Sequence, residues 1–240
     1  MKRLKIEKMP EVPYAMEEAF NRLRIGISFL GRDVRKIMIV SSLPNEGKSF
    51  VTFQMWKQMA ETGVPSVLLD MDLRKSVMAD KYHMSGAFKE KLSGMSHFLA
   101  GDNTVEEALY HTEIPSGDIL PNVDNVISPS LLIEGPRMKE LLNECAKRYR
   151  YVFVDVPPLG LVSDAEKIGS VCDGAILVVR ANSTSKNIVR NSIAQLERAG
   201  CPVLGTVLNR VETNHGGYYY KKHAGYGYYG NEYYQDSKEG

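Results

Sequence analysis

The sequence predicts an α/β fold built on a doubly wound, mostly parallel sheet. Three observations lead to this class: short apolar runs recur along the chain, stretches with helical periodicity separate them, and acidic or glycine-rich segments follow several runs directly. Apolar runs without alternation are typical of parallel strands that are covered on both faces. A length of 240 residues and an apolar content of 43% suit one such domain.

In the N-terminal half we expect residues 1–13 to be a loose N-terminal arm. Tyr14–Leu30 follow as a helix, because apolar side chains recur there every three or four positions until Gly31. The next predicted elements are a buried strand, a helix and a second buried strand, at Lys36–Val40, Gly47–Thr62 and Ser66–Asp70.

The middle of the chain, residues 75–129, is less regular. We expect two short helices and one strand there, at Met95–Ala100, Val105–Tyr110 and Asp118–Leu120. Pro129–Arg148 is helical, with a break or restart at Gly135-Pro136 because proline cannot continue a helix from within. The last predicted elements are two more strands, a helix and a final strand, at Tyr151–Asp155, Gly174–Arg180, Lys186–Ala199 and Val203–Val211.

The C-terminal segment, residues 212–240, has a different composition. It has almost no aliphatic residues, so it cannot bury enough apolar surface to fold, and we predict a disordered tail. It carries eight tyrosines: Tyr218, Tyr219, Tyr220, Tyr226, Tyr228, Tyr229, Tyr233 and Tyr234. The predicted organisation is therefore an arm (1–13), an α/β domain (14–211) and a tyrosine-rich tail (212–240).

Composition excludes several classes of function. A net charge of +1 gives no electrostatic case for nucleic-acid binding. The three cysteines form no CxxC pair, which argues against zinc and iron–sulfur sites and favours reduced thiols in the cytosol. We see no signal peptide and no apolar run long enough to span a bilayer, so we expect a cytoplasmic protein that reaches the inner face of the membrane through a partner.

The segment Ser41–Phe50, SSLPNEGKSF, joins a predicted strand to a predicted helix and contains Gly47-Lys48-Ser49. In such a P-loop, backbone N–H groups at a helix N-terminus bind phosphates. Lys48 is expected to reach the β- and γ-phosphates and Ser49 to bind Mg²⁺, although Ser42 replaces the first glycine of the usual motif. The predicted ATP contacts in the loop are Asn45, Glu46, Gly47, Lys48, Ser49 and Phe50.

Three aspartates stand at predicted strand ends. Asp70 and Asp72 are two positions apart, so an extended backbone would point both carboxylates the same way. Asp155 follows the apolar run YVFV, which is the Walker B arrangement. We expect Mg²⁺ to be held by Ser49, Asp72 and Asp155. The alternative is that the first two are solvated loop acids and the third caps a turn.

The P-loop, the strand end Asp70-Met-Asp72, VFVDVPP and the tyrosine tail, in this order, resemble the bacterial tyrosine kinases (BY-kinases) of capsule and exopolysaccharide systems. The resemblance implies a P-loop NTPase fold of the MinD/ParA type and an ATP-dependent autokinase that phosphorylates its own tail tyrosines, mainly between subunits. It implies catalytic roles for Lys48, Asp70, Asp72 and Asp155, with Asp70 as the base that takes the tyrosine proton.

The resemblance also implies partners. They are a transmembrane activator, which is a polysaccharide co-polymerase, further copies of the chain in a ring, and a cognate tyrosine phosphatase. The family's E-x-x-R-x-x-R helix matches Glu18 and Arg24, with Asn21 in the place of the first arginine and Arg22 beside it. Asn209 and Arg210 match the adenine side of the site, and Asp164 matches a further family position.

Two further departures fall near the predicted site. Asn45 replaces a glycine of the family's P-loop, and because Asn tolerates left-handed backbone we expect the loop to keep its shape. Ser76 replaces a proline after the second motif.

Two other functions stay open. A ParA/MinD-type ATPase would carry a second lysine early in the P-loop, where this chain has Leu43. A nucleotide-binding regulator without kinase activity is the other alternative, and the presence of Lys48 together with Asp70, Asp72 and Asp155 argues against it.

Overall fold

The computed structural model describes residues 2–87 and 90–211. The chain divides into two units, Met1–Arg210 and Val211–Gly240. Of the second unit only Val211 is described, so the eight tail tyrosines and the predicted disorder of the tail lie outside the described residues. All of the described helices and strands belong to the first unit.

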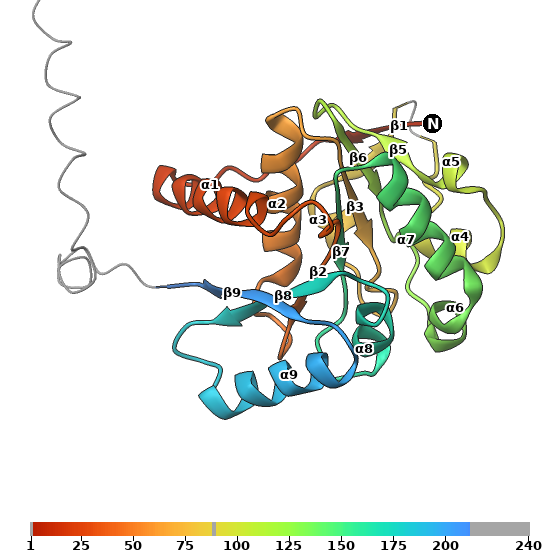
Figure 1. The fold of residues 1–240 in the computed structure, drawn as a ribbon. Helices are drawn as coiled ribbons and strands as arrows, with labels where there is room; N and C mark the ends of the chain where they lie inside the picture. The colour runs from red at the N-terminus through yellow and green to blue at the C-terminus, as the bar shows by residue number, and fades with distance from the viewer. Residues whose placement is uncertain (1, 88–89, 212–240) are drawn as a thin grey trace, which may run out of the picture. The chain divides into compact units, whose positions relative to one another are not determined.

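The described strands form a single sheet in the order β4-β1-β5-β6-β3-β7-β2-β8-β9 (Figure 1). Pairing is parallel except between β1 and β4 and between β5 and β6. The strands are β1 (Lys2–Ile6), β2 (Lys36–Ser41), β3 (Ser66–Asp70), β4 (Met84–Gly86), β5 (Tyr110–His111), β6 (Gly117–Leu120), β7 (Tyr151–Asp155), β8 (Gly174–Arg180) and β9 (Val203–Asn209). The predicted doubly wound, mostly parallel sheet is confirmed.

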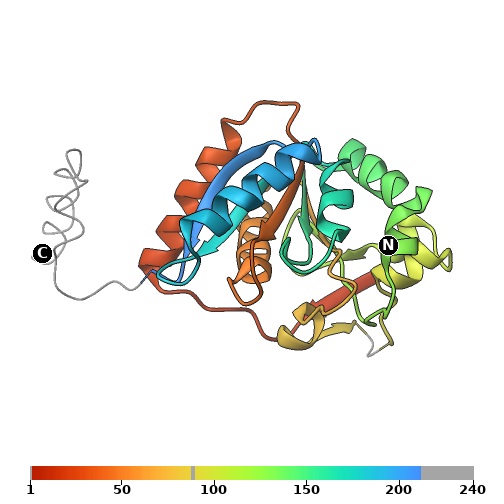
Figure 2. The ribbon, with the colours of Figure 1, turned by 90° about the horizontal axis from the view of Figure 1, so that it is seen from below.

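Helices cover both faces of the sheet (Figures 1 and 2). One apolar core joins the sheet to α1, α2 and α3, and the other joins it to α4 through α9. The bounds are α1 (Tyr14–Ser28), α2 (Lys48–Glu61), α3 (Met78–Lys81), α4 (Met95–Ala100), α5 (Val105–Ala108), α6 (Ser130–Glu134), α7 (Pro136–Arg148), α8 (Asp164–Gly169) and α9 (Lys186–Arg198). Along β2, Ile37 and Ile39 enter the first core and Met38 and Val40 the second, which explains why the strand is apolar throughout.

Three central strands bring the predicted chemistry to one edge. β2, which leads into the P-loop, pairs with β7, and β7 pairs with β3. The register sets Asp70 directly opposite Asp155. Because carboxyl ends of parallel strands form the usual ligand crevice of such sheets, this edge is where a site is expected.

The prediction of a loose N-terminal arm is wrong for Lys2–Ile6, which form β1 between β4 and β5. Leu4 and Ile6 are buried while Lys2, Arg3 and Lys5 are exposed, an alternation typical of a strand with one covered face. Four short elements were also not predicted, namely α3, β4, β5 and α8. Over the described ranges, no helix has both the length and the apolar character that crossing a bilayer requires.

Candidate active site

The loop between β2 and α2 has the backbone shape of a phosphate-binding turn. Gly47 caps α2 with φ at +94°, and Asn45 has φ at +63°, as its tolerance of left-handed backbone predicts. A Cβ on Gly47 would lie 2.1 Å from Asn209 Nδ2, which donates a hydrogen bond to the Glu46 carbonyl at 2.8 Å. A side chain at position 47 would therefore have to displace the Asn209 side chain.

Backbone donors are free where the loop enters the helix. Within the described residues, no acceptor pairs with the N–H groups of Glu46, Gly47 or Lys48. Unpaired N–H groups at the N-terminus of a fourteen-residue helix attract anions, and most strongly phosphates. This end of α2 consequently fits the phosphate chain of a nucleotide.

The Glu46 side chain holds the loop in place. It is 2% exposed and accepts hydrogen bonds from the backbone N–H groups of Leu43 (2.7 Å) and Arg180 (3.1 Å) and from the Thr184 hydroxyl. The carboxylate therefore faces the protein, and only the Glu46 backbone is placed for the ATP contact that the sequence predicts.

Lys48 lies at the centre of the acidic side chains. Its Nζ is 3.0 Å from Asp72 Oδ2 and 3.2 Å from Asp155 Oδ2, and it donates to the Ser49 hydroxyl at 3.1 Å. Burial opposes the charged form of Lys48, but the carboxylates of Asp155 and Asp72 outweigh burial and raise its pKa. The lysine is therefore a permanently charged partner of these carboxylates.

Asp155 accepts hydrogen bonds from three side chains, one of which is Lys48. Ser49 Oγ donates to Oδ2 at 2.6 Å, and Thr52 Oγ1 donates to Oδ1 at 2.9 Å. Sequence reasoning identified Ser49 and missed Thr52. The signal was available, because Thr52 is four residues after Lys48 and so shares its face of α2.

Asp70 is fully buried at the end of β3. Burial, reinforced by the nearby Asp155 carboxylate, raises its pKa to about 7. Its Oδ2 accepts a hydrogen bond from the Ser76 hydroxyl, and its Oδ1 accepts one from the Asp72 backbone at 3.3 Å. A carboxyl that exchanges its proton near neutral pH suits a general base. The contact to Ser76 was not predicted.

A second charged contact fixes the loop after β3. Arg74 makes a forked pair with the buried Asp164, at 2.6 Å from Nε and 3.1 Å from Nη2, and Ser130 joins both. The sequence singled out Asp164 only by resemblance. The pair ties the Asp72 loop to α8 and α6.

Several predicted residues lie elsewhere. The Phe50 ring packs on Phe20 of α1, at 6.1 Å between ring centroids, so only its backbone is near the loop. Arg210 is exposed just beyond β9. On α1, Arg22 is exposed and Glu18 accepts a hydrogen bond from Asn21 at 3.3 Å, away from the acidic centre.

The acidic centre fits a divalent cation that comes with a nucleotide. Three buried carboxylates, of Asp70, Asp72 and Asp155, face one ammonium group, which leaves an excess of negative charge. Within the described chain, no three His, Cys, Asp or Glu side chains form a metal site by themselves. Mg²⁺ commonly takes one or two carboxylates and completes its shell with phosphate oxygens and water, which matches this arrangement.

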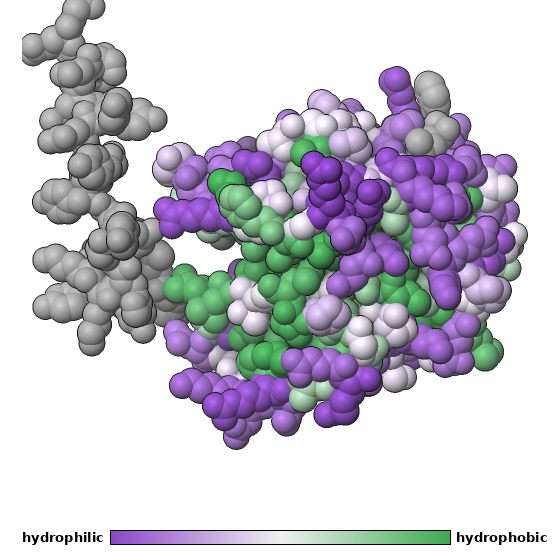
Figure 3. Space-filling view, in the orientation of Figure 1, coloured by the Kyte–Doolittle hydropathy of each residue, from purple (hydrophilic) through white to green (hydrophobic). Residues whose placement is uncertain are grey.

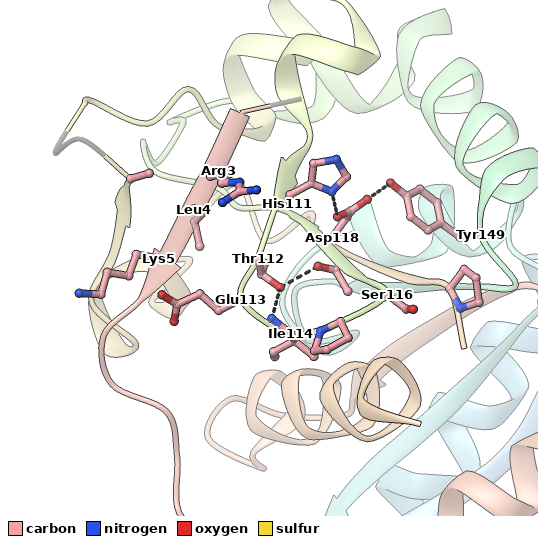
Figure 4. Close-up of a pocket in the computed structure, with 14 residues that line it drawn as sticks. Arg3, Leu4, Lys5, His111, Thr112, Glu113, Ile114, Ser116, Asp118 and Tyr149 are labelled. Carbon is pink, nitrogen blue, oxygen red and sulfur yellow. Dashed lines mark hydrogen bonds and ion pairs between the residues drawn. The ribbon is translucent and has the colours of Figure 1, made fainter. Parts of the chain in front are cut away.

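A cavity of about 720 Å³ lies away from the P-loop, between β1 and the β5–β6 hairpin (Figure 4). There His111 Nδ1 is 2.6 Å from Asp118 Oδ1, and the Tyr149 hydroxyl donates to the other oxygen of Asp118. The cavity lining contains none of the P-loop residues and none of Asp70, Asp72 and Asp155. The candidate site is thus identified by the free backbone N–H groups of the P-loop and by the charged side chains beside them, and not by the volume of a cavity.

No protein-family model matches the chain, but comparison with known proteins finds tyrosine-protein kinases as relatives. The tyrosine-protein kinase CpsD of Streptococcus pneumoniae is 32% identical over 223 residues, covering 90% of this chain and 91% of that protein. The tyrosine-protein kinase CpsD of Streptococcus agalactiae is 31% identical over 215 residues, covering 90% and 89%.

Solved structures show the same fold. The kinase domain of the Escherichia coli tyrosine kinase ETK is similar with a TM-score of 0.72 and 27% identity, over 84% of this chain and 80% of that one. The septum site-determining protein MinD of Pyrococcus horikoshii, complexed with Mg-ADP, is similar with a TM-score of 0.62 and 26% identity, over 76% and 72%.

Proposed function

The chain belongs to the bacterial tyrosine kinases of capsule and exopolysaccharide systems, and from this premise we propose that its P-loop site transfers the γ-phosphoryl group of ATP to the tyrosines of its own residues 212–240. The observation that carries the site assignment is the contact of Lys48 with Asp72 and Asp155 at the foot of the P-loop. The MinD-type ATPase shares the fold, but the tyrosine kinases are the relatives that match nearly the whole chain.

Phosphate binding falls to the P-loop. The free backbone N–H groups of Glu46, Gly47 and Lys48 would hold phosphate oxygens, and Asn209 supports the loop from β9. The Lys48 side chain is long and flexible enough for its ammonium group to move from the carboxylates to the γ-phosphoryl group, where it would neutralise negative charge. Phosphoryl transfer needs mainly such positioning and charge stabilisation.

Ser49, Asp72 and Asp155 would hold Mg²⁺. When bound there, the ion supplies further charge neutralisation on the phosphates. The three side chains already share hydrogen bonds around Lys48, and Thr52 keeps Asp155 oriented. Their positions are therefore set before any ligand arrives.

Asp70 would accept the proton of the acceptor tyrosine. A free phenol has a pKa of about 10, so a base assists its attack at neutral pH. A pKa raised to about 7 suits that task, and the hydrogen bonds from Ser76 and the Asp72 backbone fix the carboxylate.

Transfer between subunits, a homo-oligomer and a transmembrane activator complete the proposal. The family assignment supports all three, and Glu18 and Arg22 on α1 are accessible enough to contribute to contacts between copies. We place Arg210 with Asn209 on the adenine side. Regulation of capsule or exopolysaccharide synthesis, with a phosphatase that resets the tail, is the corresponding cellular role.

The test is phosphotyrosine formation after incubation with ATP and Mg²⁺, with and without the cytoplasmic part of the activator. Wild-type chain should gain tail phosphotyrosine, and Lys48→Met should not. Mixing Lys48→Met chain with active chain whose tail tyrosines are phenylalanine should label the Lys48→Met tail. A wild-type chain that binds ATP but forms no phosphotyrosine in either condition would contradict the proposal.

A further inference from the structure

The tyrosines of the folded unit differ sharply in exposure. Of the five that the structure describes, Tyr14 is 75% exposed. The other four are between 2% and 7% exposed: Tyr82, Tyr110, Tyr149 and Tyr151. The Tyr110 hydroxyl accepts a backbone hydrogen bond and the Tyr149 hydroxyl donates to Asp118, so these groups are also occupied. Within the described chain, a protein-tyrosine kinase can therefore reach one hydroxyl.

We propose that Tyr14 is a second phosphoacceptor of this kinase, modified by another copy of the chain. This inference rests on the proposed function. It adds to the tail a modification site on the folded unit itself, at the first residue of α1.

The local backbone suits an acceptor. Residues 9–13 before Tyr14 form no helix or strand, and Pro13 is extended, with φ at −61° and ψ at 150°. An extended segment can lie along an active-site cleft without unfolding. On the other side, no side chain caps α1, and its first turn is held by backbone bonds from Met16 and Glu17 to the Pro13 carbonyl. Helix ends held only in this way open readily.

The orientation of α1 makes transfer between copies the consistent route. Phe20 and Ile27 are buried, and Phe20 packs on Phe50 of α2. At about 100° per residue, Tyr14 lies on the opposite side of α1, together with the exposed Ile25 and Phe29. A side chain that points out from the body is offered to the site of a neighbour rather than to its own.

The chemical step is the same as for the tail. A bond forms between Tyr14 Oη and the γ-phosphorus, and the bond from that phosphorus to the β–γ bridging oxygen breaks. ADP leaves with the electron pair, and the phenolic proton passes to Asp70 of the phosphorylating copy. The product carries nearly two negative charges on the outward face of α1, beside Glu17 and Glu18.

The experiment uses the full chain with Tyr→Phe substitutions at the eight tail positions, incubated with ATP and Mg²⁺. We expect phosphotyrosine to persist and to map to the tryptic peptide Met9–Arg22, whose one tyrosine is Tyr14. Adding Tyr14→Phe should reduce phosphotyrosine to the level of the Lys48→Met chain. The eight-substituted chain should also label Lys48→Met chain on the same peptide.

Wild-type chain in parallel separates the two claims. Tail phosphorylation without any phosphate on Met9–Arg22 would overturn this inference and leave the proposed function intact. Phosphotyrosine that survives Tyr14→Phe in the eight-substituted chain would also overturn it, because the acceptor would then be a buried tyrosine. Wild-type chain without phosphotyrosine anywhere would overturn both.

Discussion

At the residue scale, one ammonium group compensates the acidic centre. Lys48 is 7% exposed and contacts two of the three buried carboxylates. Buried ion pairs stabilise little by themselves, but removing one partner leaves the others uncompensated. The site is therefore sensitive to the loss of this lysine in stability as well as in activity.

We expect Lys48→Met to lower the free energy of unfolding by about 2–4 kcal/mol at neutral pH and to lower kinase activity at least about 100-fold. The loss of stability should shrink in acid, as the carboxylates take up protons. Urea unfolding at several pH values and a phosphotyrosine assay measure the two effects. Lys57→Met is the matched control, because Lys57 is on the same helix and its pair with Glu61 is partly exposed, so its effect should stay within about 0.5 kcal/mol.

Asp70 gives a pH-dependent prediction. Its pKa is about 7 in the folded chain against 3.8 in its unperturbed state, so the folded state holds the extra proton between these values. Stability attributable to this group is thus complete below about pH 4 and is lost as pH rises through about 7. Asp70→Asn should raise the free energy of unfolding by about 2–4 kcal/mol at about pH 8 and change it little at about pH 4.

Thermal or urea unfolding at the two pH values tests this, with Asp80→Asn as an exposed control from the nearby α3. Asp70→Asn should also abolish phosphotyrosine formation. Equal stability of wild type and Asp70→Asn at about pH 8 would contradict the assigned pKa.

Site residues at strand ends could be predicted from the sequence because each acidic residue stands at, or directly after, the end of an apolar run. Asp70, Asp72 and Asp155 are such cases, and the structure brings them together. Ser76 and Asn209 are different. Their hydrogen bonds to Asp70 and to Glu46 follow from loop paths and strand order, which no local pattern encodes.

At the element scale, the junction of β2 and α2 depends on Gly47. It has left-handed backbone, and the Asn209 side chain of β9 occupies the space that a Cβ would need. Gly63, after α2, also has a positive φ, of +80°, but nothing lies within 4 Å of its missing Cβ. Substitution of Gly63 therefore introduces backbone strain alone, whereas substitution of Gly47 introduces the same strain together with a steric clash.

Gly47→Ala and Gly63→Ala should each cost about 1–2 kcal/mol of unfolding free energy from left-handed strain. Only Gly47→Ala should also weaken nucleotide binding, by at least about tenfold, because it displaces Asn209 and the loop. Titration with a fluorescent ATP analogue and urea unfolding test this pair. A similar loss of affinity in both variants would show that crowding at Asn209 is unimportant.

The central strands were predicted well because each contains an unbroken apolar run. β2, β3, β7 and β8 match the expected runs within a residue at each end. β1 was missed because its charged residues suggested a solvated terminus, although alternation was present. The two-residue β5 and four-residue α3 are too short for periodicity, and tertiary pairing creates them.

At the scale of the whole molecule, several large apolar side chains remain exposed, and some of them lie around α1 and on β9. Ile25 and Phe29 of the α1 region are 46% and 82% exposed, and Leu208 of β9 is 61% exposed. Figure 3 shows hydrophobic side chains at the surface around α1 and over β9, between hydrophilic regions. Exposed apolar groups gathered in this way commonly mark an interaction surface.

If copies of the chain associate through α1, Phe29→Glu should shift the mass measured by sedimentation towards that of one chain. Stability should change by no more than about 0.5 kcal/mol, because the side chain is already exposed. Phe29→Leu keeps the apolar character and should leave the mass as in wild type. An unchanged mass for Phe29→Glu would remove α1 from the interface.

The contact of Lys48 with Asp72 and Asp155 couples the binding of phosphates to the binding of a divalent cation. Phosphates that draw the ammonium away leave the carboxylates in need of a cation, and a divalent cation at the carboxylates releases the ammonium for phosphates. Each ligand improves the affinity for the other, and thermodynamic reciprocity makes the two improvements equal. The site therefore acts as a coincidence detector, because a nucleotide and a divalent cation bind more tightly together than either does alone.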